Sequence, residues 1–167
     1  KLNIDGRNLL AAIVAGYDVM IRIGRVMNPS AVKRGFHLTP VIGPMASAAA
    51  VGKLLDLDPT RLRNAMSIAA ILGAGLFDAF KAPEPFVEIQ IARACESGIS
   101  AALLAKEGVP GNDEILEKAF IPAHTDQYQL DSISQGLADP YMITQTYIKM
   151  HGGCRHIHAP IDATVAI

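Results

Sequence analysis

The sequence predicts a mainly α-helical, bundle-like protein, and three observations support that prediction. Apolar side chains recur at helical spacing in several segments of this 167-residue chain. Capping residues and Gly or Pro stops bracket most of these segments. Half of the residues are hydrophobic and 19% are charged, so the chain can bury one sizeable core. We expect about five or six helices, one short strand and no internal repeat.

The first expected helix begins after Asp5, a residue type that caps helix N-termini. Asp18 and Arg22 lie four residues apart, a spacing that suits an ion pair on the solvated face. Asn28 and Pro29 then end the helix. Its apolar positions are Leu10, Ile13, Val14, Tyr17, Met20, Ile21 and Gly24.

Two further helices are expected before the middle of the chain. The alanine-rich segment at about 44–55 has so little side-chain bulk that another helix could pack closely against it. Asp58 and Pro59 mark the start of the next helix, because Asp caps it and Pro fits its first turn. That helix is expected to end at Gly73.

The second half of the chain contains one long helix and several less regular parts. Residues 76–85 carry two prolines and are expected to form a loop, after which a helix runs over about 86–106. A short helix opens at Asn112, whereas residues 119–140 show no clean period. The β-branched and aromatic segment 143–148 predicts a short strand. Pro160 opens a last helix.

Composition excludes several classes of function. The net charge is −1 with no basic stripe, so a nucleic-acid partner is not expected. No apolar run is long enough to span a membrane, and no secretion signal opens the chain. Cys95 and Cys154 are expected to be free thiols of a cytoplasmic protein.

Because the sequence lacks an initiator Met and stops within an incipient helix, we expect it to be a segment of a longer polypeptide.

Residues 149–158 concentrate the chemically active side chains. These ten residues hold three of the five histidines, together with Lys149, Cys154 and Arg155. The two cations could bind an anionic substrate while His158 transfers a proton. Cys154 is a weaker candidate for a nucleophile. A neighbouring arginine can lower the pKa of a thiol, but the sequence does not distinguish such a thiol from a structural one.

Other readings of this segment stay open. His151, Cys154, His156 and His158 are possible zinc ligands, but their spacing matches no standard zinc site, so no metal is predicted. The histidines could equally bond to loop backbone at the surface. His37 is a second candidate for proton transfer, because it follows the cations Lys33 and Arg34 on a loop.

Several segments of the chain form an ordered set: residues 16–24, 34–37, 43–50, 53–58, 65–70, 98–108 and 147–163. Taken in this order, they resemble the MmgE/PrpD family, which includes 2-methylcitrate dehydratases, cis-aconitate decarboxylases and iminodisuccinate epimerases. Each motif alone has low specificity, and their order and spacing make the resemblance specific. It covers most of the chain outside 76–92 and 121–142.

The resemblance implies an all-helical first domain, residues 1–142, and the start of a small α/β domain, residues 143–167. It also implies a homodimer without metal or organic cofactor. Members of this family move a proton next to a carboxylate of a small di- or tricarboxylate, so the resemblance implies a lyase or isomerase. We favour a hydro-lyase similar to 2-methylcitrate dehydratase, with an epimerase as the alternative.

The resemblance also implies site residues. His37, Lys149 and His158 match catalytic positions of the family, and Lys149, Arg155 and Cys154 are expected to bind the substrate. The chain departs from the family before the long helix, where a common lysine is absent and Lys81 stands several residues early. Parts of the family's active site lie outside the sequence, so this segment alone is expected to be incomplete or inactive. A non-catalytic helical interaction module is the rival interpretation.

Overall fold

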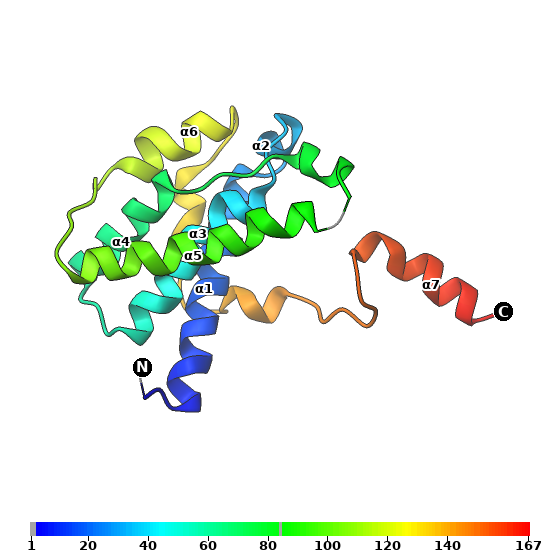
Figure 1. Cartoon of the computed structure of the whole chain (residues 1–167), viewed down its shortest axis with the longest axis horizontal. Coiled ribbons are helices and arrows are strands. Elements are labelled where there is room, and N and C mark those ends of the chain that lie inside the picture. The colour runs from blue at the N-terminus through cyan, green and yellow to red at the C-terminus, as the bar shows by residue number, and fades with distance from the viewer. Residues whose placement is uncertain (1–2, 84) are drawn as a thin grey trace.

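The protein is described here by a computed structural model that covers residues 3–83 and 85–167. Four helices form its body: α1 (Gly6–Met27), α3 (Leu38–Leu54), α4 (Pro59–Ile71) and α5 (Phe86–Lys106). The helix α3 lies at the centre, because it packs against each of the other three (Figure 1). The prediction of a mainly α-helical fold is confirmed.

The ends of the long helices follow the capping signals. The carboxylate of Asp5 accepts a hydrogen bond from the backbone N–H of Asn8 at 2.8 Å, and that of Asp58 accepts one from Arg61 at 2.9 Å. The helix α5 covers the range expected for it. The helix α3, however, begins at Leu38 rather than near Pro44. An interior proline usually disfavours a helix, because it lacks a donor and its ring crowds the carbonyl one turn before, but its φ is helical and α3 continues through Pro44.

Small residues set the distance between the central helices. A Cβ atom at Gly98 of α5 would lie 2.4 Å from the carbonyl oxygen of Pro44 in α3. A Cβ atom at Gly16 of α1 would lie 3.1 Å from the carbonyl oxygen of Ala46. The alanine-rich helix is therefore packed closely on two sides, as its sequence predicted.

The expected solvated face of α1 is in fact buried. Asp18 and Arg22 are only 9% and 6% exposed, and Arg22 Nε donates to the Asp18 carboxylate at 2.7 Å. Arg22 also donates to the carbonyl oxygens of Ile133, Gln135 and Gly136. The irregular segment 130–142 crosses α1 here, and its backbone needs these partners.

Conversely, several apolar positions of α1 face outward. Leu10 is 65% exposed and Tyr17 is 45% exposed, so the predicted buried stripe is wrong for the first half of this helix. The buried side is formed instead by Ala12, Ile23, Val26 and Met27. The reason is that α1 meets α3 through its small residues and meets segment 130–142 through a polar pair.

Short helical pieces connect and follow the body. They are α2 (Ser30–Lys33), α6 (Ile121–His124), α7 (His158–Val165) and a π-helical turn at Leu116–Phe120. The others are 3-10 turns at Phe77–Lys81, Leu130–Ile133, Met142–Gln145 and Arg155–Ile157. The expected loop at 76–85 therefore contains one turn of helix.

The strand predicted at 143–148 is not formed. Residues Met142–Gln145 make a 3-10 turn, and the residues after it have no regular structure. Arg25 of α1 fixes this turn by donating to the side-chain oxygen of Gln145 at 2.6 Å. A strand needs a neighbouring strand for its backbone hydrogen bonds, and none pairs with this segment in the described part of the chain. The α/β character expected for residues 143–167 remains a prediction.

The C-terminal segment leaves the bundle. Figure 1 shows α7, in red, standing clear of the other helices at the end of an extended connection. Among the described residues, no helix combines the length and the apolar character that crossing a bilayer requires.

Candidate functional site

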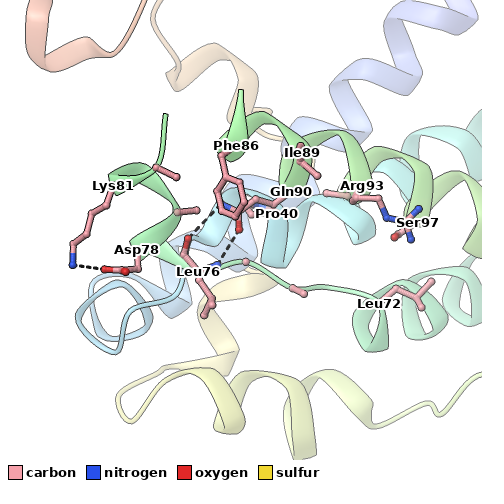
Figure 2. Close-up of a pocket in the computed structure, with 15 residues that line it drawn as sticks. Pro40, Leu72, Leu76, Asp78, Lys81, Phe86, Ile89, Gln90, Arg93 and Ser97 are labelled. Carbon is pink, nitrogen blue, oxygen red and sulfur yellow. Dashed lines mark hydrogen bonds and ion pairs between the residues drawn. The ribbon is translucent and has the colours of Figure 1, made fainter. Parts of the chain in front are cut away.

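A cavity of about 760 Å³ opens between α5 and the segment 72–82. Figure 2 shows Phe86, Ile89, Gln90 and Arg93 of α5 facing this space across from Leu76. Most of the lining is apolar, with a few polar groups at fixed places, as in many small-molecule sites. The polar side chains that line it are Asp78, Lys81, Gln90, Arg93 and Ser97.

His37 lies beside this cavity, at the N-terminal end of α3. Its ring is half-buried and makes edge contacts with Phe80 and Phe77, at centroid distances of 4.9 and 6.4 Å. Its backbone N–H donates to the carbonyl oxygen of Gly75 at 3.1 Å, which joins it to the cavity wall. Burial lowers the pKa of His37 below its ordinary value, so the ring is neutral near pH 7.

The charged groups of the cavity are paired and largely exposed. The Lys81 ammonium forms an ion pair with Asp78, whose hydrogen bond and charge raise the pKa of Lys81. Arg93 pairs with Glu96, one turn further along α5. These pairs are weak in water, so the two cations can exchange their partners for an anionic ligand.

The other candidate residues lie together on the C-terminal segment. Lys149 Nζ donates to the carbonyl oxygen of Gly153 at 2.9 Å. The guanidinium of Arg155 stacks over the ring of Tyr147, 5.2 Å from its centroid. Cys154 is exposed and has no disulfide partner in the described residues. The two cations and the thiol are thus all within one short stretch of chain.

His158 is the buried member of this group. It is 2% exposed, and its Nε2 atom is buried without a hydrogen-bond partner among the described residues. Burial, and next the charge of Arg155, lower the pKa of His158. The ring of His151 contacts it, and His151 Nε2 lies 2.6 Å from the Asp162 carboxylate. That hydrogen bond lowers the pKa of Asp162.

The structure does not bring the two groups of candidates together. His37 precedes α3 in the helical body, whereas Lys149, Cys154 and Arg155 lie in the segment before α7 and His158 is the first residue of α7. Figure 1 shows α7 standing clear of the helices of the body. In the described residues, no three or more His, Cys, Asp or Glu side chains are placed so that they could hold a metal ion.

Of the polar residues that line the cavity, Lys81 alone was singled out from the sequence; Asp78, Gln90, Arg93 and Ser97 were not. Gln90 and Arg93 stand three residues apart on α5, with Phe86 and Ser97 one turn before and after them. This helical spacing was the available signal, since it puts the four side chains on one face. It could not be used without knowing that segment 72–82 lies opposite.

The structure is an all-helical domain with a cavity between α5 and segment 72–82. The chain belongs to the MmgE/PrpD family, because the MmgE/PrpD N-terminal domain matches it over residues 1–131. This finding confirms the resemblance seen in the sequence.

Fungal relatives match nearly the whole chain, and a human relative matches about two thirds of it. It is 31% identical to the cis-aconitate decarboxylase-like protein oryM of Aspergillus oryzae, over 98% of this chain and 36% of that protein. It is 28% identical to the cis-aconitate decarboxylase of Aspergillus terreus, over 96% of this chain and 34% of the relative. The human cis-aconitate decarboxylase is 34% identical over 68% of this chain and 23% of its own length. The chain thus spans about a third of the length of its fungal relatives.

Proposed function

We propose that this chain is the helical part of a lyase that acts on a small di- or tricarboxylate. The observation that carries the proposal is the cavity beside His37, whose volume of about 760 Å³ suits a small organic acid. Arg93 and Lys81 line it and can pair with carboxylates of such a substrate. A neutral histidine next to it supplies a hydrogen-bonding and proton-transfer group.

Decarboxylation of cis-aconitate is the reaction that we put first. The relatives described above carry that activity in their names, which favours it over the dehydration expected from the sequence. Dehydration of 2-methylcitrate and epimerisation of iminodisuccinate remain the alternatives. In each of these reactions negative charge develops next to a carboxylate, so a nearby cation or hydrogen-bond donor lowers the barrier.

We assign roles to both groups of candidate residues. Lys149 and Arg155 bind carboxylates, with exposed Cys154 beside them, while His37 and His158 are the groups that can donate or transfer a proton. Because the two groups lie apart in this chain, the proposal requires them to meet in the assembled protein, for which we propose a cytoplasmic homodimer. No metal or organic cofactor enters the proposed reaction.

The test is a comparison of three reactions with the full-length protein. Carbon dioxide release from cis-aconitate, water loss from 2-methylcitrate and epimerisation of iminodisuccinate are each measured with wild type and with His37→Gln. We expect turnover of cis-aconitate and a drop of about 100-fold or more in kcat/KM for the variant, as is usual for a lost acid–base group.

His124→Gln is the matched control. His124 is also half-buried and contacts aromatic rings, but its Nδ1 atom bonds to the carbonyl oxygen of Phe120 and it does not line the cavity. We expect its kcat/KM to stay within about threefold of wild type, because the substituted side chain does not line the cavity. Failure to turn over any of the three substrates would refute the proposed function.

A further inference from the structure

Gln90 connects the cavity to His37, and the backbone of Leu76 determines how its amide is oriented. Gln90 Oε1 accepts a hydrogen bond from the Leu76 N–H at 3.0 Å. Gln90 Nε2 lies 3.3 Å from the Leu76 carbonyl oxygen. An N–H can only donate and a carbonyl oxygen can only accept, so the reverse orientation of the amide would lose both bonds.

This orientation constrains the imidazole ring. The same Gln90 Nε2 atom lies 3.3 Å from His37 Nδ1. The amide nitrogen is a donor without a lone pair to offer, so His37 Nδ1 must be the acceptor. A neutral histidine carries one ring proton, and that proton must then be on Nε2.

We propose that Gln90 is a positioning residue that holds His37 in the neutral form with its proton on Nε2. This inference rests on the proposed function for its meaning in catalysis. In that reaction His37 would present a hydrogen-bond donor to a substrate carboxylate or to its developing charge. Accepting the substrate proton would fall to another group, for which His158, with its unpartnered Nε2 atom, is the candidate.

The surroundings of His37 support the neutral form. Its aromatic neighbours Phe77 and Phe80 carry no charge, and burial is the cause of its lowered pKa. A proton on Nδ1 would face the amide N–H of Gln90, so the positive form is opposed by this contact as well. Several charged groups on the neighbouring elements form ion pairs of their own: Asp78 with Lys81, Arg93 with Glu96, and Arg34 with Asp126. Lys33 of α2 and Glu88 of α5 also stand on these elements, and both are exposed to solvent.

The test is nitrogen NMR spectroscopy of the full-length protein labelled with ¹⁵N in its histidine rings. The signals of His37 are identified by their loss in His37→Gln, and the couplings to ring protons show which nitrogen is protonated. In wild type we expect a protonated Nε2 and a bare Nδ1 at neutral pH.

Gln90→Glu is the decisive variant. A carboxylate at this position can still accept the hydrogen bond from the Leu76 N–H, but it cannot donate to His37 Nδ1 and can only accept a hydrogen bond from it. We expect the ring proton to move to Nδ1 and the pKa of His37 to rise by about one to three pH units. Gln90→Met removes the amide without adding charge and should give a mixture of the two neutral forms. Gln127→Glu, on an exposed loop residue, adds the same charge and should change neither quantity.

Two results would overturn the inference: a neutral His37 of wild type with its proton on Nδ1, or a Gln90→Glu spectrum identical to that of wild type. If Gln90→Glu does not fold, the wild-type spectrum and Gln90→Met still decide. The proposed function fails separately. A protein that turns over no tested carboxylate but shows the Nε2–H form of His37 loses the function and keeps the inference.

Discussion

At the scale of single residues, the environment of His37 determines its charge. The ring packs against phenylalanines and receives a hydrogen bond from Gln90, so it is easier to protonate in the unfolded chain than in the folded one. The unfolded state therefore binds more protons between the lowered pKa of the folded state and the ordinary value of about 6.5. Stability contributed by the neutral ring is present above that range and is lost as pH falls through it.

This linkage gives a prediction for pH dependence. We expect the free energy of unfolding, measured with urea, to decrease as pH falls from 7 to 5. His37→Gln removes a titrating group and should decrease less over the same interval. Equal slopes for wild type and His37→Gln would show that His37 is not held in its neutral form by the fold.

The sequence located candidate residues better than it located their partners. His37 and the group at 149–158 stand out by residue type, and the resemblance supplied roles for them. Gln90 could not be found in the same way, because its role depends on Leu76 and His37, which are far from it in sequence. Contacts of this kind arise only once α5 lies against the segment 72–82.

At the scale of the helices, the capping signals predicted most helix ends, apart from the start of α3, whereas the buried face of α1 was predicted wrongly. The caps at Asp5 and Asp58 form as expected because capping is a local interaction. The face of α1 was misjudged, since Asp18 and Arg22 look like a solvated pair until segment 130–142 covers them. The buried side of a helix depends on what packs against it. Because segment 130–142 has no helical period, the sequence did not predict that it would pack on α1.

The Arg22 contacts predict a large loss of stability for Arg22→Met. The substitution leaves Asp18 as an unpaired buried charge and removes donors from three carbonyl groups. We expect the free energy of unfolding to fall by about 3–5 kcal/mol, measured by urea denaturation. Arg34→Met breaks the exposed pair with Asp126 and should cost less than about 1 kcal/mol. Similar losses for both variants would contradict the role given to Arg22.

The contact between α3 and α5 predicts the effect of a single methyl group. In Gly98→Ala the new Cβ atom would lie 2.4 Å from the Pro44 carbonyl oxygen and from the Ser47 Cβ atom, so the helices must separate. We expect a loss of about 1–3 kcal/mol in the free energy of unfolding. In the control Gly6→Ala, the added Cβ atom meets nothing within 4 Å. A Gly98→Ala protein as stable as this control would contradict the close approach of α5 to α3.

At the scale of the whole molecule, the helical body and the C-terminal segment differ in packing. Ile148 is 90% exposed and Met150 is 83% exposed, although both are large and apolar. The β-branched and aromatic residues of 143–148, which include Ile148, predicted a strand, but a strand forms only where another strand offers its backbone. The sequence could indicate this preference but could not supply the partner. We propose that these side chains become covered when the assembled protein brings Lys149 close to His37.

The central claim is that His37 and Lys149 serve one transition state, and a double-mutant cycle on the full-length protein tests it most directly. The measured quantity is kcat/KM for cis-aconitate in wild type, His37→Gln, Lys149→Met and the double variant. Residues that act together are strongly non-additive, so we expect the double variant to lose far less than the sum of the two single losses, with a coupling of at least about 1 kcal/mol. Losses that add within about 0.5 kcal/mol, or single variants with wild-type turnover, would contradict the account.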